Sequence, residues 1–476
     1  MSLWPYSIFL LLLFILLTSS NGAFGNNASN EPTLPLKRLQ RTQQSNSPSC
    51  YSQKSKTENG AIILEMQHKD YCFGSISDMH RKRQKQLVAD EIRVRSIQAS
   101  IKNIISGKTE TLSQTQIPIA SGVKLHTLNY IVTVMLGGRN TTVIVDTGSD
   151  LTWVQCQPCI LCYNQPEPLF NPSVSPTYHS VVCNSSACQN LQSATGNSGL
   201  CGSDLKECNY VVNYGDGSYT RGELGQDHLV LGSTSVENFV FGCGRNNKGL
   251  FGLASGVMGL GGSGLSLISQ TSEIFGSVFS YCLPSAEAKS SGSLVLGGDT
   301  STFKNSTTIS YTRMLANPQL FTLYFLNLTG ATIGGVAIQD SAFGERGMII
   351  DSGTVITRLP PTIYKAAKAE FLKQFSGYPL RPGISILETC FDLSAYEEVN
   401  VPTIKMQFEG GAEMEVDVTG VLYIVKNDAS QVCLALASLQ YDDEIGIIGN
   451  YQQKNTRVIY DIKQSQVGFA KETCSF

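Results

Sequence analysis

A duplicated acidic turn places the strongest constraint on how this chain can fold. Val143–Asp150 reads VIVDTGSD, so an apolar, β-branched run ends in a carboxylate that is followed by Thr-Gly-Ser. Met348–Val355 reads MIIDSGTV and repeats the same order. Burying a lone carboxylate costs several kcal/mol unless hydrogen bonds or a shared proton relieve it. The repeat therefore predicts two turns that face each other, with Asp146 and Asp351 close enough to share one proton.

Each acidic turn is followed by a second repeated element, in which two apolar residues precede a glycine. These elements are GVMGLG at Gly256–Gly261 and GIIGN at Gly446–Asn450. Glycine lets another backbone approach closely, as a segment squeezed beneath a catalytic turn requires. The letters GLGGSG also match a dinucleotide-binding fingerprint, but no βαβ pattern surrounds them, so we reject that interpretation.

The sequence pattern from about residue 121 onward predicts a mostly β body. Short runs rich in Val, Ile and Tyr alternate there with Gly, Asn and Ser. One helix is expected at Pro361–Phe375, where proline stands at the start and apolar residues recur at helical spacing. A length of 476 residues with 42% apolar content allows two or three domains. The repeat breaks between residues 300 and 325, which predicts two lobes of similar size.

The N-terminus and the cysteines indicate the secretory pathway. The first 23 residues carry no charged side chain, and the apolar run Ile8–Leu17 is too short for a bilayer span of about 20 residues, so we expect a signal peptide at residues 1–23. Fourteen cysteines fit an oxidising compartment. The spacing in CQPCILC resembles a zinc site, but no second ligand pair accompanies it, so we expect no metal. Candidate glycosylation sites are Asn27, Asn140, Asn184, Asn305 and Asn327.

A basic leader precedes an acidic body. Residues 24–120 hold 14 Lys and Arg against 8 Asp and Glu, whereas the residues after them hold 21 against 30. Within the leader, MHRKRQKQLVADEIRVRSIQASI has helical apolar spacing at Leu87, Ile92, Val94 and Ile97. Three interpretations stay open: a solvated amphipathic helix, a removable pro-segment whose Lys or Arg occupies the carboxylate site, and a nucleic-acid-binding patch.

The motifs DTGSDLTW, YGDGS and DSGT, with the two glycine elements, resemble those of pepsin-type aspartic proteases. The cysteine-dense insert after DTGSDLTWVQCQPC is similar to that of the plant nepenthesin-like branch. The resemblance covers roughly residues 121–476. It implies an all-β, bilobal fold with an active cleft between an N-terminal catalytic lobe at 121–310, which holds the insert, and a C-terminal catalytic lobe at 311–476. Residues 24–120 would then be the pro-segment.

The resemblance also implies roles for individual residues. Asp146 and Asp351 correspond to the catalytic dyad, which titrates as a pair. Thr147 and Ser352 correspond to a hydroxyl pair that braces the two turns. The amides of Gly148 and Gly353 would face the carboxylates, and Ser149 and Thr354 would bind their outer oxygens. Tyr214 corresponds to the tyrosine of a mobile flap that also holds Gly215, Asp216 and Gly217, with Trp153 behind it.

Six disulfides follow from the resemblance, since cysteine counting alone cannot choose among pairings. They are Cys156–Cys159, Cys162–Cys243, Cys183–Cys208, Cys188–Cys201, Cys282–Cys474 and Cys390–Cys433. Cys50 and Cys72 would remain in the leader.

We therefore expect a secreted aspartic endopeptidase, made as a zymogen, that cleaves polypeptides at acidic pH. The expected protein is a monomer with no cofactor, no nucleic-acid partner and no membrane attachment after signal cleavage, in the extracellular space or the vacuole. The alternatives are a catalytically silent binding or inhibitor protein on the same fold, and a nucleic-acid-associated protease of plastids.

Overall fold

The computed structural model describes residues 31–36, 53–68, 79–105, 130–202, 206–214, 217–249, 251–285, 291–298, 308–338, 343–344, 347–474 and 476. The expected signal peptide and the leader cysteines Cys50 and Cys72 lie outside these residues, as do Asn27 and Asn305. The compact unit described below begins at Pro32.

The body is built mainly of β-strands, as predicted. The first half contains β4 (Tyr130–Leu136), β5 (Arg139–Asp146), β6 (Trp153–Gln155), β7 (His179–Ser180), β8 (Leu200–Cys201), β9 (Cys208–Asn213), β10 (Tyr219–Leu231), β11 (Thr234–Lys248), β12 (Gly256–Gly259), β13 (Val278–Cys282) and β14 (Gly292–Leu296). Its short helices are α5 (Ser186–Gln189), α6 (Leu191–Thr195), α7 (Leu267–Gln270) and α8 (Ser272–Phe275).

The second half contains β15 (Ser310–Leu315), β16 (Phe325–Leu326), β17 (Leu328–Ile333), β18 (Val336–Ala337), β19 (Met348–Ile350), β20 (Thr357–Leu359), β21 (Leu380–Arg381), β22 (Cys390–Phe391), β23 (Glu398–Asn400), β24 (Ile404–Phe408), β25 (Glu413–Val416), β26 (Leu422–Ile424), β27 (Val432–Leu434), β28 (Leu436–Ser438), β29 (Gly446–Ile448), β30 (Thr456–Asp461) and β31 (Gln466–Lys471). Its helices are α9 (Pro361–Gln374) and α10 (Val418–Val421). Helix α9 matches the predicted helix to within one residue.

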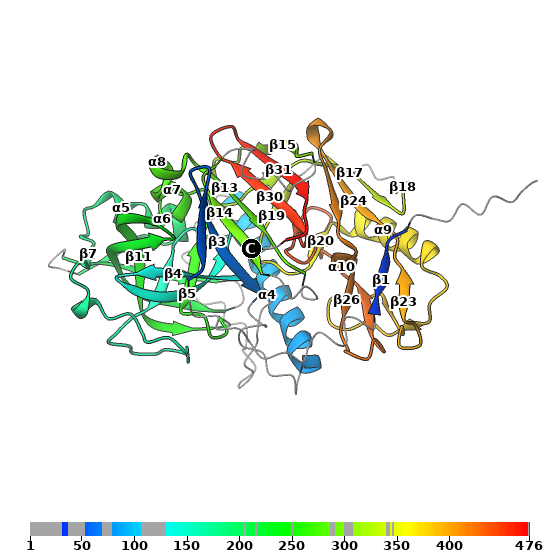
Figure 1. Cartoon of the computed structure of the whole chain (residues 1–476), viewed down its shortest axis with the longest axis horizontal. Helices are drawn as coiled ribbons and strands as arrows, with labels where there is room; N and C mark the ends of the chain where they lie inside the picture. The colour runs from blue at the N-terminus through cyan, green and yellow to red at the C-terminus, as the bar shows by residue number, and fades with distance from the viewer. Residues whose placement is uncertain are drawn as a thin grey trace, which may run out of the picture. The chain divides into compact units, whose positions relative to one another are not determined.

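One antiparallel sheet joins both halves of the chain to the leader. The leader contributes β1 (Thr33–Pro35), β2 (Ser55–Glu58), β3 (Ala61–His68) and α4 (Met79–Ile105). Strand β3 lies between β4 and β14, and the pairing continues through β13, β30, β31 and β15. Figure 1 shows β3 beside the strands of both halves. The leader is therefore part of the hydrogen-bonded framework of this chain.

Helix α4 is packed against the body, so the interpretation as a solvated helix is wrong. Leu87, Val94 and Ile101 recur every seven residues and are at most 4% exposed. Leu87 joins a core cluster with Val355 and Ile356, while Val94 and Ile101 join one with strands of the second half. Burial of an apolar side chain of this size stabilises a docked state by about 1.5–3 kcal/mol. This apolar stripe fixes which face of α4 meets the body.

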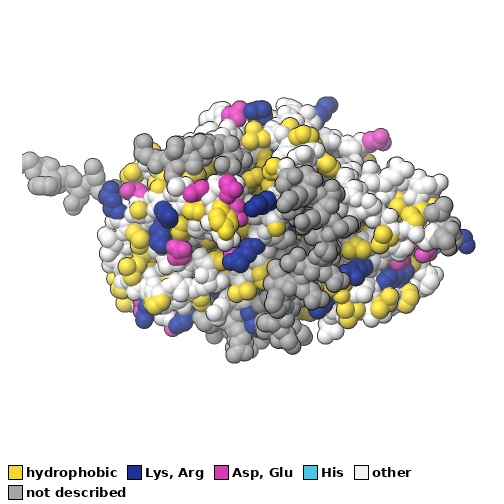
Figure 2. Space-filling view, turned by 180° about the vertical axis from the view of Figure 1, so that it is seen from behind, with side chains coloured by type: hydrophobic (Ala, Val, Ile, Leu, Met, Phe, Trp, Pro, Cys, Tyr) yellow, Lys and Arg dark blue, Asp and Glu magenta, His cyan; other side chains and the backbone are white. Residues whose placement is uncertain are grey.

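The described lysines and arginines form no single basic patch on the face drawn in Figure 2. There they lie scattered among acidic, apolar and neutral groups. Among the described residues, no helix is both long and apolar enough to cross a bilayer.

Four of the six expected disulfides were wrong, and two were right. The structure pairs Cys156 with Cys243, Cys159 with Cys162, Cys183 with Cys201, and Cys188 with Cys208, in place of Cys156–Cys159, Cys162–Cys243, Cys183–Cys208 and Cys188–Cys201. Cys282–Cys474 and Cys390–Cys433 are present as expected.

Strand pairing explains the exchange of partners. Parallel pairing of β6 with β11 sets Val154 opposite Cys243, which brings Cys156, the residue that follows β6, near that cysteine. The β8–β9 register sets Cys201 directly opposite Cys208, and each bonds a different cysteine of the insert. The sulfurs of Cys183, Cys188 and Cys201 lie within 4.8 Å of one another, but each is already in a disulfide.

Candidate active site

The two acidic turns stand in equivalent places in the two halves. Asp146 is the last residue of β5, which pairs in parallel with β12, and Gly259 lies opposite it. Asp351 follows β19, which pairs in parallel with β29. The amide of Leu260 donates to the carbonyl of Asp146 at 2.8 Å, and the amide of Asp351 donates to the carbonyl of Ile448 at 3.1 Å. The predicted glycine elements therefore lie directly against the acidic turns.

Glycine is required where these segments cross. A Cβ on Gly259 would overlap the backbone of Asp150, and one on Gly449 would overlap the backbone of Val355. Neither backbone can move without displacing the turn that carries an aspartate. The sequence repeat thus reflects a steric requirement of the crossing.

Both carboxylates receive the same set of hydrogen bonds. The amide of Gly148 donates to Asp146 Oδ1 at 3.1 Å, and the hydroxyl of Ser149 donates to Oδ2 at 2.7 Å. For Asp351, the amide of Gly353 donates to Oδ1 at 2.9 Å and the hydroxyl of Thr354 to Oδ2 at 2.6 Å. Hydrogen bonds to the charged form are what makes a buried carboxylate tolerable.

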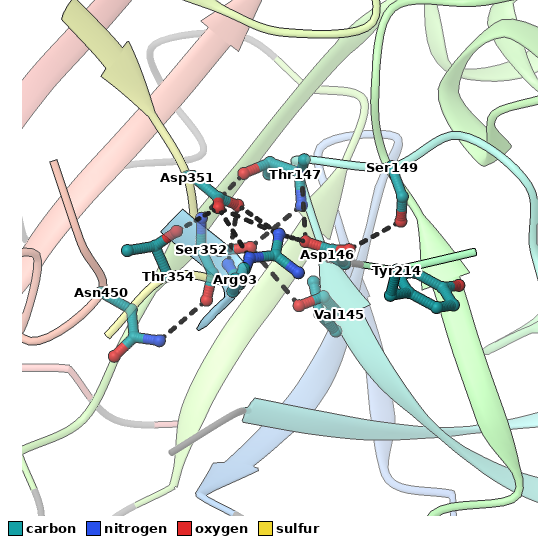
Figure 3. Close-up of polar contacts among 12 residues, drawn as sticks. Arg93, Val145, Asp146, Thr147, Ser149, Tyr214, Asp351, Ser352, Thr354 and Asn450 are labelled. Carbon is teal, nitrogen blue, oxygen red and sulfur yellow. Dashed lines mark hydrogen bonds and ion pairs between the residues drawn. The ribbon is translucent and has the colours of Figure 1, made fainter. Parts of the chain in front are cut away.

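The two turns also hold each other. The amide of Thr147 donates to Ser352 Oγ at 3.1 Å, and the amide of Ser352 donates to Thr147 Oγ1 at 2.9 Å. The side-chain amide of Asn450 donates to the Ser352 carbonyl at 2.8 Å. Thr147, Ser352 and Asn450 are all buried. Figure 3 shows the reciprocal pair between the aspartates.

A guanidinium from the leader lies between the two aspartates (Figure 3). Arg93 Nη2 is 2.9 Å from Asp146 Oδ1 and 2.9 Å from Asp351 Oδ2, and Nε donates to the same Asp351 oxygen at 3.2 Å. Burial acts to lower the pKa of Arg93, but the charges of Asp146 and Asp351 outweigh it and raise that pKa above its ordinary value. Arg93 therefore stays charged and occupies the space between the carboxylates.

A close approach around Arg93 leaves no room for larger residues at the turn glycines. A Cβ on Gly148 would lie 2.7 Å from Arg93 Nη2 and 2.8 Å from Asp351 Oδ1. A Cβ on Gly353 would overlap Asp146 Oδ1. The absence of a Cβ at each glycine therefore leaves room for the aspartate of the other turn and for the Arg93 guanidinium.

The tyrosine of the predicted flap lies at the end of a hairpin formed by β9 and β10. The indole Nε1 of Trp153 donates to Tyr214 Oη at 2.7 Å, and Phe251 packs edge-on against both rings. The amide of Gly217 donates to the Tyr214 carbonyl at 3.0 Å. Gly215 and Asp216 lie outside the described residues.

Comparison with known proteins places this geometry in a family. The family model described as Xylanase inhibitor N-terminal matches residues 130–298, and the one described as Xylanase inhibitor C-terminal matches residues 323–471. An Arabidopsis thaliana aspartyl protease family protein is 42% identical over 393 residues, which cover 81% of each chain. Nepenthesin-2 of Nepenthes gracilis, an aspartic proteinase, is 36% identical over 81% of this chain and 84% of its own. The chain belongs to the plant nepenthesin-like aspartic proteases.

This aspartic protease shares its fold with seed proteins of solved structure. The basic 7S globulin from soybean covers 73% of this chain and 95% of its own, with a TM-score of 0.57 and 20% sequence identity. Conglutin gamma from lupine seeds gives a TM-score of 0.55 at 18% identity. The expected all-β, pepsin-like class is thereby confirmed. The relatives named as aspartic proteases confirm the expected reaction class, an aspartic-type endopeptidase acting on polypeptides.

Several residues around the two aspartates of this aspartic protease were not predicted from the sequence. Asp150 ends the motif DTGSD and is buried, with Oδ1 accepting from the amide of Ser263 at 2.9 Å. Burial raises the pKa of Asp150 to about 6. The position of Asp150 beside the duplicated acidic turn was a usable signal. Asn450 could likewise have been found from the final letter of GIIGN.

The leader residues that meet the body were harder to predict. Asp90 lies one turn before Arg93 and contacts a buried arginine, Arg358. Gln98 exchanges hydrogen bonds with the backbone of Ile445 at 2.6 and 3.1 Å. Only the apolar stripe of α4 indicated which of its many polar side chains would face the body.

The expected glycosylation sites differ in exposure. Asn140 and Asn184 are exposed. Asn327 is half-buried, and its amide nitrogen donates to Glu409 at 3.2 Å.

Proposed function

We propose that Asp146 and Asp351 are the catalytic dyad of this endopeptidase. A water molecule held between the carboxylates loses a proton to the ionised aspartate as its oxygen attacks the scissile carbonyl carbon. The protonated partner donates a hydrogen bond to the carbonyl oxygen and then its proton as the tetrahedral intermediate forms. The first aspartate then gives the proton taken from water to the amide nitrogen, while the second aspartate takes a proton back from a hydroxyl of the intermediate. The C–N bond breaks, and a carboxylic acid and an amine leave. The observation that carries this proposal is the convergence of both carboxylates on a single guanidinium nitrogen.

The residues around the dyad keep the two carboxylates in one geometry in this proposal. Thr147 and Ser352 fix the spacing of the turns, and the donors of Gly148, Ser149, Gly353 and Thr354 hold one rotamer of each aspartate. Preorganised polar groups contribute to catalysis because they need not reorient as charge develops. Tyr214 would close over substrate on the β9–β10 hairpin, with Gly217 at its tip and Trp153 fixing the hydroxyl.

We further propose that residues 24–120 form a pro-segment and that the described state is the latent enzyme. A guanidinium bonded to both aspartates excludes the water and the peptide that catalysis needs. Removal of α4 would open an active cleft between catalytic lobes at 121–310 and 311–476. The leader, the disulfides and the exposed sequons support maturation in the secretory pathway, with an extracellular or vacuolar destination and a monomeric form.

The test is acid-dependent proteolysis by the secreted full-length chain. We expect cleavage of a denatured protein after acidification, abolished by Asp146→Asn and by pepstatin and unaffected by a chelator. The outcome that would overturn the dyad assignment is equal activity in the wild-type and Asp146→Asn chains. The assay should run from about pH 2 to 7, which brackets the ordinary pKa values of carboxyl groups and histidine, about 4 to 6.5. A wild-type chain that is processed yet inert over this whole range would instead favour a binding or inhibitor protein.

A further inference from the structure

Beside the dyad, α4 fills a second polar site with a charge opposite to that of Arg93. Asp90 Oδ1 accepts from the amide of Val355 at 2.6 Å, and Oδ2 accepts from the amide of Ile356 at 3.2 Å. Arg358 Nη2 donates to the same Oδ2 at 2.8 Å. The carboxylate of Asp90 thus sits in a cradle of two backbone amides and one guanidinium.

The cradle belongs to the same turn as a catalytic aspartate. Val355 and Ile356 directly follow Thr354, whose hydroxyl bonds Asp351. Arg358 comes two residues later, in β20, and its Nη1 donates to the Ile356 carbonyl at 2.8 Å. Because the Arg358 guanidinium is hydrogen-bonded to the turn that holds the two amides, we expect the three donor groups to keep their positions without α4.

Arg358 depends on the leader for its counter-charge. Its side chain is 0% exposed, and so is that of Asp90. Among the described residues, its ion pairs reach only Asp90 and Glu91, and the pair with Glu91 Oε2 spans 3.5 Å. Arg358 Nε is buried without a hydrogen-bond partner in the described structure. Departure of α4 would therefore leave an arginine and two amides that need an acceptor.

We propose that, in the processed enzyme, Arg358 and the amides of Val355 and Ile356 form an anion-binding subsite that selects an acidic residue of the polypeptide substrate. This proposal rests on the proposed protease function and extends it to specificity. A carboxylate accepts from two amides and a guanidinium at once, as the side chain of Asp90 does, whereas a neutral amide side chain presents a single acceptor oxygen.

The placement of Asp90 along α4 sets the expected position of the acidic residue. Asp90 precedes Arg93 by three residues, so their Cα atoms are about 4.5 Å apart along the helix axis. An extended substrate rises about 3.3 Å per residue, so the selected residue lies one or two positions from the scissile bond.

The experiment compares matched peptides on the acid-processed enzyme. Fluorogenic peptides carry either Glu or Gln at each position within three residues of the cleaved bond, and kcat/KM is measured at pH 5.5, where a free Glu with a pKa of about 4.3 is ionised. At one position we expect the Glu peptide to be cleaved about tenfold faster or more.

Variants assign the preference to the cradle. Arg358→Met should bring the ratio of kcat/KM for the Glu peptide to that for the Gln peptide to about one. Arg358→Lys keeps the charge but loses the planar set of guanidinium donors, so it should give an intermediate ratio. Arg313→Met is the control, because Arg313 is an exposed arginine that pairs with Glu409. It should keep the wild-type ratio.

Each result decides between failure of this inference and failure of the protease assignment. Cleavage of every Gln and Glu peptide at equal rates by the wild type, or a ratio unchanged in Arg358→Met, overturns the anion subsite. No cleavage of any peptide after processing overturns the protease function instead. If Arg358→Met does not fold, as judged by thermal unfolding, the wild-type ratio and the Arg358→Lys ratio still decide.

Discussion

Replacing Arg93 by leucine is the most direct test of the proposed latency. Leucine fills the aliphatic part of the side-chain volume but brings no charge between the aspartates. In the native chain, one nitrogen lies 2.9 Å from each of two carboxylates. We therefore expect Arg93→Leu to weaken docking of α4 without altering the apolar stripe that packs the helix.

The size of the effect follows from the two ion pairs. Opposite unit charges about 4 Å apart attract by about 4 kcal/mol at an effective dielectric constant near 20. Much of that attraction is offset by the cost of burying the charges, and removal of one partner from a buried pair typically costs 3–5 kcal/mol. Taking about 3 kcal/mol, the equilibrium constant between docked and undocked α4 shifts about 100-fold toward the undocked form.

Two measurements report this shift. Capture of the unprocessed chain on immobilised pepstatin at pH 5 reports access to the aspartates, and the appearance of a shorter chain during a stepwise pH decrease reports processing. The matched control is Arg95→Leu, because Arg95 lies on the same helix, is 71% exposed and pairs only with Glu91 of α4 in the described structure. We expect Arg93→Leu alone to be captured and to convert at a higher pH. Equal behaviour of the two variants would refute the blocking role.

Three further changes test the environment of the dyad and the framework. Asp150→Asn should flatten the pH dependence of stability, measured as the free energy of unfolding in urea. The pKa of Asp150 is about 6 in the fold against 3.8 ordinarily, so the wild type loses up to about 3 kcal/mol of unfolding free energy as the pH rises from 3.8 past 6, and the variant should not. Gly353→Ala should lower kcat at least about 100-fold through overlap with Asp146, whereas Gly377→Ala, which meets open space, should keep full activity. Replacing both Cys282 and Cys474, which close a loop of 192 residues, by serine should lower the unfolding free energy by about 2–5 kcal/mol in denaturant titration.

The arrangement of the two aspartates was predictable because its geometry is local and duplicated. Each turn supplies its own amide and hydroxyl donors within three residues of the aspartate, so the motif letters carry nearly all of the arrangement. The glycine elements were predictable for the same reason, since a backbone crossing excludes any Cβ whatever the rest of the chain does.

The disulfides of the insert were not predictable at this level. Cys183, Cys188, Cys201 and Cys208 lie close together, so either pairing closes loops of similar length. The choice depends on the β8–β9 register, which sets two of these cysteines side by side. Register is a tertiary property and leaves no trace in cysteine spacing.

The contacts of the leader were only partly predictable from the sequence. A basic residue at the carboxylates was one of three open interpretations, and helical phase decides which arginine it is. Arg93 follows Asp90 by three residues and precedes Val94 on the packed side of α4, while Arg95 points to solvent. An acid within an apolar stripe, as Asp90 is beside Leu87, was the signal that a buried partner existed.

The Asp90 contact of α4 does not supply the acid-dependent release that the proposed pro-segment needs. Burial raises the pKa of Asp90 despite the opposing charge of Arg358, so the docked helix holds a proton on Asp90 more tightly than the free helix does. Proton uptake at Asp90 therefore favours docking as the pH falls, and docking is weakened as the pH rises through that raised value. A proposed release of α4 in acid is therefore not driven by Asp90, and the contact of Arg93 with Asp146 and Asp351 is the one to test for it.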